Sequence, residues 1–419
     1  MIKLLSAFAV NKVTALVAGP SGMTLIGQVQ SVTAILQGAS SGLFSTAAVK
    51  YSAEWKGRPE RLRSFLCLSY TLVFWIALAV GSCTGALSTW LAKVLLNDSG
   101  YWWVFAILAI TIPLFAVNSL VLSVLNGLGD VRKLTLLNVG QSIFGLAISI
   151  GLPLALGLAG ALAATVLASA VVFVLIVPEL KKHDWLQLRR VRSSEGIEDL
   201  KRLGGFALMA LTSAICGPLS QLLVRGLIAE RCSIVEAGYW HGLMRFSGAY
   251  LIFFTTTLSV YFLPRFSTLD NKGVQRELRH GYALIIPTLA ALFTGIWLAR
   301  SWLIPLLFSR EFAPMEALLG YQLIGDFLKI GSWVMSFLML ARSKTVLFVA
   351  SEIGFGALYV VLAMILVAPD GTGGARGAVI AWIVLYAVYW LFLILSLPAL
   401  LRSNRRMSST NYRDSGDRS

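Results

Sequence analysis

The sequence predicts an all-α polytopic membrane protein with about twelve transmembrane helices in two six-helix lobes, related by a pseudo-two-fold axis along the membrane normal. Three observations support this fold class. Hydrophobic residues make up 57% of the chain and charged residues only 13%, about half the charged share of soluble proteins. The apolar residues gather in long stretches separated by alternating basic gaps. The second half of the chain also repeats features of the first.

Twelve apolar stretches are long enough, or nearly so, to cross about 30 Å of hydrocarbon at about 1.5 Å per residue. In chain order they are 4–20, 25–49, 64–91, 101–125, 134–156, 158–180, 203–228, 238–264, 281–308, 317–341, 345–367 and 375–400. No small-x-small cleavage site follows the first stretch, so we expect it to be a helix and not a signal peptide. The longest gap, 181–202, is too short to form a soluble domain.

Basic residues alternate between the gaps and predict the orientation of the chain. Twenty-five of the 35 Lys and Arg residues lie in the regions 50–63, 132–133, 181–202, 265–279, 342–344 and 402–418. The intervening gaps hold only Lys93, Arg231, Arg300, Arg310 and Arg376. By the positive-inside rule, the first set and both termini face the cytoplasm. The net charge of +15 therefore reflects membrane topology, with membrane lipids as neighbours of the basic loops, and does not indicate nucleic-acid binding.

Weak internal similarity relates the two halves. The sequence KGRPERLR at 56–63 corresponds to KGVQRELR at 272–279, and GLAGA at 157–161 corresponds to GARGA at 374–378. Lys12 in the first stretch corresponds to Arg225 in the seventh. Because each half has an even number of spans, both insert the same way up and form parallel repeats with a substrate site between the lobes.

This repeat predicts four regions. Residues 1–180 form an N-terminal lobe of six helices, and 203–402 form a C-terminal lobe of six helices. Residues 181–202 form a basic cytoplasmic linker between the lobes, and 403–419 form a disordered cytoplasmic tail.

Common enzyme motifs are missing from the sequence. The dipeptide Gly-Lys never occurs, so no Walker A loop for ATP exists, and neither GxSxG nor HExxH is present. The four cysteines and three histidines have no metal-ligand spacing. We therefore expect no catalytic residue, metal or cofactor, and a transport process driven by an ion gradient or by the substrate's own gradient.

Ionisable residues inside the apolar stretches are the candidate functional groups, because a charge there usually faces a cavity or a partner. They are Lys12, Arg225, Arg245, Asp326, Lys329 and Glu352. Lys12 and Arg225 occupy corresponding places in the two halves, so a two-lobed fold would place both beside one central cavity. A cavity lined by such cations suits an anion such as a phosphate. Alternatively, both side chains reach outward to the lipid headgroups.

The other ionisable groups also allow two interpretations. Asp326 and Lys329 share one helical face and either neutralise each other or make Asp326 a protonation or cation site. Glu352 is either a proton relay or a group that reaches cytoplasmic water. Arg245 either lines an outer vestibule or anchors in headgroups.

Several stretches resemble those of one transporter family. They are 206–212, 259–264, the Gly19-Pro20-Ser21-Gly22 turn with Lys12 before it, and 321–331, which carries the pattern Gln-Leu-x-Gly-Asp-x-x-Lys. These are similar to the Wzx-type flippases, the O-antigen and lipid III flippases of the multidrug/oligosaccharidyl-lipid/polysaccharide exporter superfamily. The resemblance covers almost the whole chain and is densest at 203–353.

The resemblance implies a function and a place in the cell. The family moves an undecaprenyl-diphosphate-linked oligosaccharide from the cytoplasmic to the periplasmic leaflet of the bacterial inner membrane by alternating access. Lys12, Arg225, Arg245 and Lys329 would then meet the diphosphate, and Asp326 and Glu352 would couple transport to protons or sodium ions. A polysaccharide polymerase and a chain-length regulator are the expected partners. The alternatives are a drug/cation antiporter of the same superfamily and, less favoured, a membrane enzyme acting on lipid-linked glycans.

Overall fold

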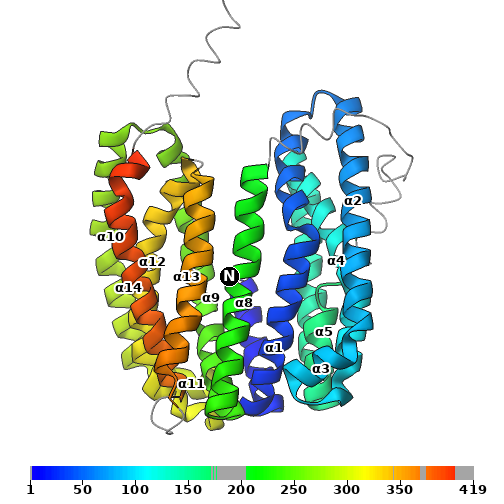
Figure 1. The fold of residues 1–419 in the computed structure, drawn as a ribbon, viewed down its shortest axis with the longest axis vertical. Coiled ribbons are helices and arrows are strands. Elements are labelled where there is room, and N and C mark those ends of the chain that lie inside the picture. The colour runs from blue at the N-terminus through cyan, green and yellow to red at the C-terminus, as the bar shows by residue number, and fades with distance from the viewer. Residues whose placement is uncertain are drawn as a thin grey trace, which may run out of the picture.

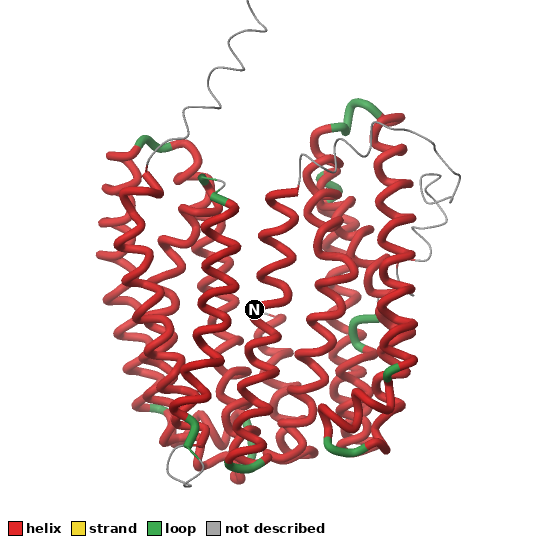
Figure 2. Tube along the Cα trace, viewed as in Figure 1, coloured by secondary structure: helices red, strands yellow, loops and turns green. Residues whose placement is uncertain are grey.

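The computed structural model describes residues 2–170, Phe173, Ile176, 204–342, 344–368 and 374–401. All regular elements in these ranges are helices (Figure 2). Ten of them are long and apolar enough to cross a membrane. Two of the ten each bend at an internal glycine that divides them into two helices. The ten candidate spans of the described residues therefore comprise twelve helical segments, and the predicted fold class is confirmed. Most of the predicted sixth span beyond residue 170 lies outside the described residues.

The N-terminal lobe is formed by the helices α1 (Ile2–Glu54), α2 (Pro59–Ala86), α3 (Ser88–Leu96), α4 (Trp102–Leu128) and α5 (Val131–Leu167). Gly19 in α1 has φ 61° and ψ −174°, a conformation that side chains with a Cβ rarely adopt. Pro20 follows it at the first position of the next helical segment, where no backbone N–H is needed. Gly157 bends α5 in the same way, with φ 61°.

The C-terminal lobe is formed by the helices α8 (Gly204–Arg231), α9 (Ile234–Thr268), α10 (Asn271–Leu298), α11 (Arg300–Leu307), η3 (Arg310–Met315), α12 (Glu316–Ala341), α13 (Thr345–Leu366) and α14 (Gly374–Leu401). Side-chain caps begin two of these helices. The Ser233 hydroxyl accepts a hydrogen bond from the backbone N–H of Glu236, and the Asp270 carboxylate accepts one from that of Gly273. These caps satisfy free N–H groups at the helix starts.

Two predicted spans have different limits in the structure. The stretch 64–91 is divided at Leu87 between α2 and the short α3, and the stretch 281–308 is divided at Ala299 between α10 and the short α11. Both α2 and α10 begin several residues earlier than predicted, inside the basic gaps. A helix of 28 residues measures about 42 Å at 1.5 Å per residue, so its first turns extend beyond the hydrocarbon.

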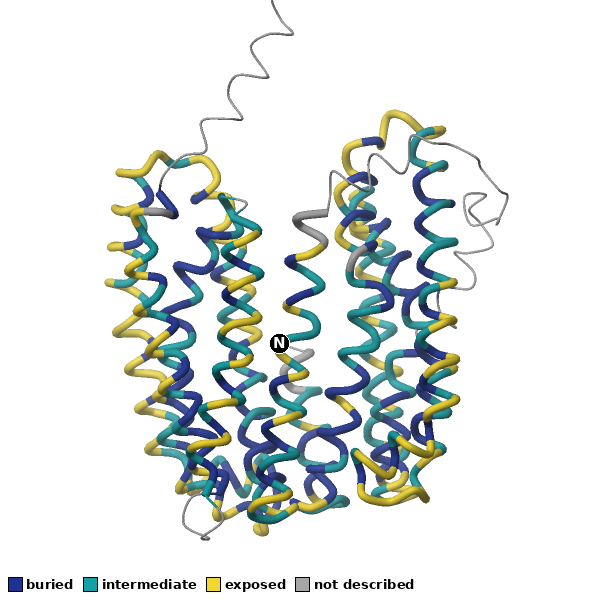
Figure 3. Tube along the Cα trace, viewed as in Figure 1, coloured by how far each residue is buried: buried dark blue, intermediate teal, exposed yellow. Residues whose placement is uncertain are grey.

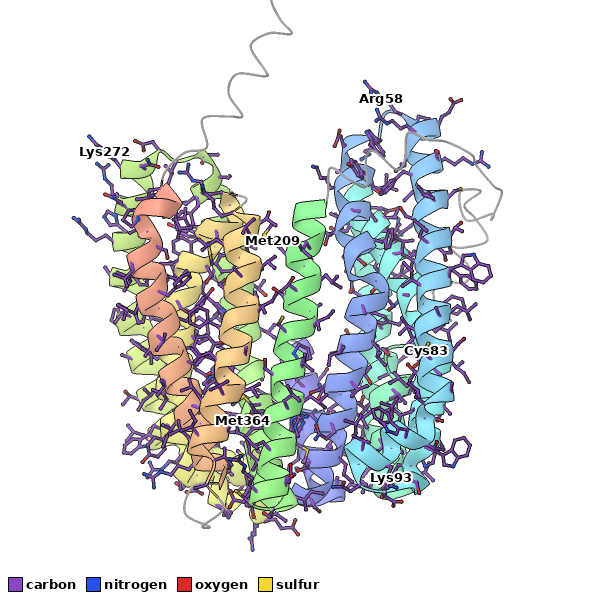
Figure 4. The ribbon with its side chains drawn as sticks, in the orientation of Figure 1. Arg58, Cys83, Lys93, Met209, Lys272 and Met364 are labelled. Carbon is purple, nitrogen blue, oxygen red and sulfur yellow. The ribbon has the colours of Figure 1, made fainter. Side chains whose placement is uncertain are left out.

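Figure 1 shows two groups of helices that meet at one end of the molecule and lie farther apart at the other. We call the end with the loops 55–58, 129–130 and 269–270 the basic end, and the opposite end the closed end. Arg58 and Lys272 lie at the basic end, and Lys93 lies at the closed end (Figure 4). Exposed residues cover the outer faces of α2 and α10 (Figure 3), where apolar side chains such as Leu284, which is 71% exposed, suit contact with lipid.

The predicted linker 181–202 and tail 403–419 lie outside the described residues. The lobe boundaries that depend on them stay a prediction.

Candidate functional site

A cavity of about 440 Å³ lies within the C-terminal lobe between α8, α12, α13 and α14. We call it the C-lobe cavity. It contains one cation, Lys329, and one carboxylate, Glu352. The rest of its lining combines small polar groups, among them Ser213 and Ser220 of α8, with many aromatic rings. The aromatic residues are Trp333, Phe337, Phe348, Phe355, Tyr359, Trp382, Tyr386 and Tyr389.

The ammonium group of Lys329 lies among three aromatic rings. Its Nζ atom is 4.5 Å from the ring centroid of Trp382, 5.0 Å from that of Trp333 and 5.3 Å from that of Tyr386. Each contact is a cation–π interaction, in which the ring's negative face attracts the charge. Lys329 is therefore held by aromatic rings at the wall of the cavity.

Asp326 faces a different environment although it lies three residues earlier on α12. It is 0% exposed, and its carboxylate accepts hydrogen bonds from the hydroxyls of Ser247 and Tyr250, from the Gln322 amide at 3.0 Å and from Trp382 Nε1 at 3.1 Å. These donors come from α9, α12 and α14. Within the described residues Asp326 and Lys329 form no ion pair. Trp382 connects them instead, because its N–H binds the carboxylate and its ring faces the ammonium.

Glu352 enters the C-lobe cavity from α13, opposite α12. Its carboxylate is half-buried, and Ser213 of α8 and the positive charge of Lys329 lie near it. The cavity therefore holds an acid and a base of opposite charge on facing helices, with a serine beside the acid. Such a pair can exchange protons or accommodate an ion.

Arg225 lies where the two lobes meet. It is 0% exposed, and its guanidinium donates hydrogen bonds of 3.2 Å to Gln28 and to Ser31 of α1. It also stacks at 5.6 Å over the ring of Trp240. No carboxylate pairs with it among the described residues. A buried cation without a counterion is costly and marks a position that an anion can occupy.

Lys12 lies near the closed end and also joins the lobes. Its Nζ donates a hydrogen bond of 2.6 Å to the carbonyl oxygen of Pro305 and another to that of Phe308, at the C-terminal end of α11. A cation at a helix C-terminus is favourable because the unpaired carbonyls carry partial negative charge. Thr24 of α1 adds a hydrogen bond of 2.6 Å to the carbonyl of Ile234 on α9. Lys12 and Arg225 thus both act between the lobes in this structure.

Arg245 is half-buried on α9, one helical turn from His241. It has no hydrogen-bond or ion-pair partner within the described ranges, and it is not among the residues that line the C-lobe cavity. His241 is 4% exposed and lies beside the Arg225 guanidinium, next to Gly27. Arg225, His241 and Arg245 therefore extend as basic groups from the lobe interface towards the basic end.

A second cavity of about 370 Å³ lies in the N-terminal lobe between α4 and α5, towards the basic end. We call it the N-lobe cavity. Its lining contains amides and hydroxyls but no charged residue. The lining residues are Phe115, Asn118, Ser119, Leu122, Ser123, Asn126, Leu134, Asn138 and Gln141.

The aromatic rings around Lys329 belong to the candidate site but are not among the residues that the sequence analysis predicts. A signal for them existed in helical spacing. Trp382, Tyr386 and Tyr389 recur at intervals of four and three residues, which places them on one face of α14. Trp333 follows Lys329 by one turn of α12.

Comparison with known proteins gives a consistent result. The family model described as "Polysaccharide biosynthesis protein" matches residues 64–317. Two curated proteins named lipid III flippase, from Escherichia coli (strain K12) and Shigella flexneri, are each 29% identical over 391 residues, which cover 92% of this chain and 93% of each relative.

Solved structures of low identity share the fold. An inward-facing multidrug resistance transporter of the MATE family gives a TM-score of 0.76 at 16% identity and covers 97% of this chain and 96% of its own. An outward-facing structure of such a transporter gives 0.60, also at 16% identity, over 96% and 94%. The lipid II flippase MurJ in an inward closed conformation gives 0.73 at 14% identity, over 94% and 86%.

Proposed function

This chain belongs to the family of polysaccharide biosynthesis proteins, and we propose that it is a flippase for a lipid-linked oligosaccharide. Its cargo is an undecaprenyl-diphosphate-linked oligosaccharide, an O-antigen unit or the lipid III of enterobacterial common antigen. The protein moves this cargo from the cytoplasmic to the periplasmic leaflet of the bacterial inner membrane by alternating access. The observation that carries the proposal is the similarity to the two lipid III flippases, which extends over 92% of the chain.

The orientation follows from the distribution of charge. The basic end faces the cytoplasm, and both termini lie on that side. Both cavities lie towards the basic end, and hydrogen bonds from Lys12, Thr24 and Arg225 join the lobes towards the closed end. This arrangement suits a state that accepts cargo from the cytoplasmic leaflet.

The four cations act on the diphosphate at different stages. Lys329 and Arg245 are not engaged between the lobes and meet the diphosphate first. Lys12 and Arg225 donate their hydrogen bonds to α11 and α1 in the present state, so the diphosphate binds them when the closed end opens and those partners separate. Each cation thereby exchanges a protein acceptor for a phosphate oxygen, which limits the cost of an unpaired buried charge.

Glu352 is the primary candidate for ion coupling, with Asp326 as its second element. A proton or a sodium ion neutralises Glu352 and so changes its attraction to Lys329 across the C-lobe cavity. Both oxygens of Asp326 already accept hydrogen bonds, so its part is to keep Trp382 and Gln322 in place around the cavity. Membrane lipids, a polysaccharide polymerase and a chain-length regulator complete the set of partners.

The drug/cation antiporter is less favoured. The multidrug transporters with this fold are only 16% identical to the chain. An identity this low indicates a shared fold but does not indicate a shared cargo. The cation-rich set of Lys12, Arg225, Arg245 and Lys329 also suits an anionic cargo. Both curated relatives are named as flippases and neither as an enzyme.

The test is a flipping assay in proteoliposomes with an undecaprenyl-diphosphate oligosaccharide, with and without an imposed proton or sodium gradient. We expect transport that requires the diphosphate and rises with one of the gradients. Glu352→Gln should transport at a rate that no longer responds to that gradient, because its side chain cannot change charge. Folded protein that moves drugs but no lipid-linked saccharide would overturn the proposal in favour of the antiporter.

A further inference from the structure

The two cavities occupy equivalent positions in the internal repeat. Adding 214 to the residue numbers of the N-lobe cavity turns eight of its nine lining residues into residues that line the C-lobe cavity. Examples are Phe115 with Lys329, Asn138 with Glu352, and Gln141 with Phe355. This offset agrees with the separation of 213 between Lys12 and Arg225. The repeat therefore places one cavity in each lobe at matching depth.

The chemistry of the two cavities differs at these equivalent positions. The C-lobe cavity has a cation at 329 and a carboxylate at 352, whereas the N-lobe cavity has Phe115 and Asn138 there. The N-lobe cavity thus has no charged lining residue, and its polar groups are amides and hydroxyls. Amides both donate and accept hydrogen bonds, which matches the hydroxyl and acetamido groups of sugars.

Two amides of the N-lobe cavity have unused hydrogen-bonding capacity. Asn118 is 1% exposed, and its Oδ1 atom has no partner within the described part of the chain. Gln141 is half-buried and has no hydrogen bond to any residue that the structure describes. A buried amide without partners costs about 1–3 kcal/mol, and polar groups at membrane depth usually face water or a ligand. The unpaired amides therefore indicate a ligand or water molecules in this cavity.

We propose that the N-lobe cavity is a subsite for an uncharged sugar of the transported glycan. The inference rests on the proposed function and adds a recognition site to it. Its volume of about 370 Å³ lies within the range of small-molecule sites, about 300–1,000 Å³. Asn118, Asn138 and Gln141 recognise the sugar by hydrogen bonds, while the charged groups of the C-terminal lobe serve the diphosphate and the coupling ion.

The experiment compares two lipids in binding to the full-length protein in nanodiscs. One is undecaprenyl diphosphate carrying an N-acetylglucosamine disaccharide, and the other is undecaprenyl diphosphate without sugar. Gln141→Leu should weaken binding of the sugar-bearing lipid about five-fold, the effect of one lost hydrogen bond, and leave binding of the sugar-free lipid unchanged. Asn138→Leu should also weaken binding of the sugar-bearing lipid alone, and it replaces Gln141→Leu in the experiment if that variant does not fold.

Thr135→Leu is the matched control, because Thr135 is exposed on the same helix and does not line the cavity. It should leave both affinities unchanged. Equal weakening of both lipids by Gln141→Leu, weakening of neither, or a wild-type protein that binds the two lipids equally would overturn the subsite. Sugar-dependent binding without flipping would support the subsite and reject the proposed function, so the two failures are distinguishable.

Discussion

At the scale of single residues, Trp382 links the acid and the base of α12. Its indole N–H lies 3.1 Å from the Asp326 carboxylate, and its ring lies 4.5 Å from the Lys329 ammonium. The negative charge of Asp326 draws the indole into one orientation, and that orientation presents the ring face to Lys329. Asp326 thereby positions Lys329 without touching it.

Asp326→Asn tests this network. The amide nitrogen of Asn donates and does not accept, so at least one of the donors from Ser247, Tyr250, Gln322 and Trp382 loses its acceptor. We expect the free energy of unfolding to fall by about 2 kcal/mol, the typical contribution of a hydrogen bond to a charged group. Thermal unfolding in detergent measures this change.

Glu352→Gln is the control, because it also replaces a carboxylate by an amide but at a half-buried position in the cavity wall. Its melting temperature should fall less than that of Asp326→Asn. A melting temperature of Asp326→Asn equal to that of the wild type would contradict a stabilising role for the carboxylate.

Sequence reasoning identified the ionisable residues of the C-lobe cavity but not their partners. Lys329 and Glu352 are recognisable because charges are rare in apolar stretches. The three-residue spacing of Asp326 and Lys329 suggested a direct pair, since it places them on one helical face. In the structure Asp326 accepts hydrogen bonds from α9, α12 and α14, whereas Lys329 lies against rings of α12 and α14, and the two side chains share only Trp382. The spacing of residues along one helix does not predict which side chains of neighbouring helices they contact.

At the scale of helices, the crossing of α1 and α9 fixes the closed end. A Cβ atom on Gly238 of α9 would lie 1.8 Å from the carbonyl oxygen of Pro20 on α1. Only glycine permits this approach of the two backbones. The bend at Gly19 directly precedes Pro20, so both glycines lie where α1 approaches α9 most closely.

Gly238→Ala should separate α1 from α9 and favour a state in which the closed end is open. Overpacking of this kind costs about 1–3 kcal/mol, which is enough to change the populations of two states markedly. Distances between spin labels on the two lobes at the closed end should therefore lengthen.

Gly248→Ala on the same helix is the matched control, because a Cβ there meets nothing within 4 Å. It should leave the distances unchanged. Identical distance distributions for Gly238→Ala and wild type would show that this contact does not hold the closed end.

The helices themselves were largely predictable, and their ends were less so. Apolar length predicts each span. Gly157 falls in the gap between two predicted spans, whereas Gly19 lies inside the end of the first predicted span, 4–20. The short helices α3 and α11 were included in longer stretches, because hydropathy continues across Leu87 and Ala299 while the chain changes direction there. Amino-acid composition does not indicate where the chain changes direction, so the turns at Leu87 and Ala299 are recognised only in the structure.

At the scale of the whole molecule, the lobes are joined by hydrogen bonds that lie towards one end. The contacts of Lys12 with α11 and of Thr24 with Ile234 connect α1 to the C-terminal lobe there. Alternating access requires these contacts to break once in every cycle. Holding them together should stop transport without unfolding either lobe.

A short thiol-reactive crosslink between Thr24→Cys and Ile234→Cys, in a chain whose native cysteines are replaced, tests this requirement. We expect flipping in proteoliposomes to fall at least ten-fold and to return when the crosslink is reduced. A crosslink between Ser45→Cys and Ser119→Cys is the control, since those hydroxyl oxygens lie 2.9 Å apart within the N-terminal lobe. Undiminished flipping by the first crosslinked protein would contradict separation of the lobes at this end.

The two cavities occupy matching positions in the two lobes, and this arrangement bears on how an elongated cargo is oriented in the protein. A carrier made of two identical halves would treat the two ends of an elongated molecule alike. Here the same scaffold presents amides on one side and charges on the other. With the proposed sugar subsite, this difference between the cavities gives the molecule a polarity, so that a cargo with a neutral head and an ionic neck should enter in only one alignment.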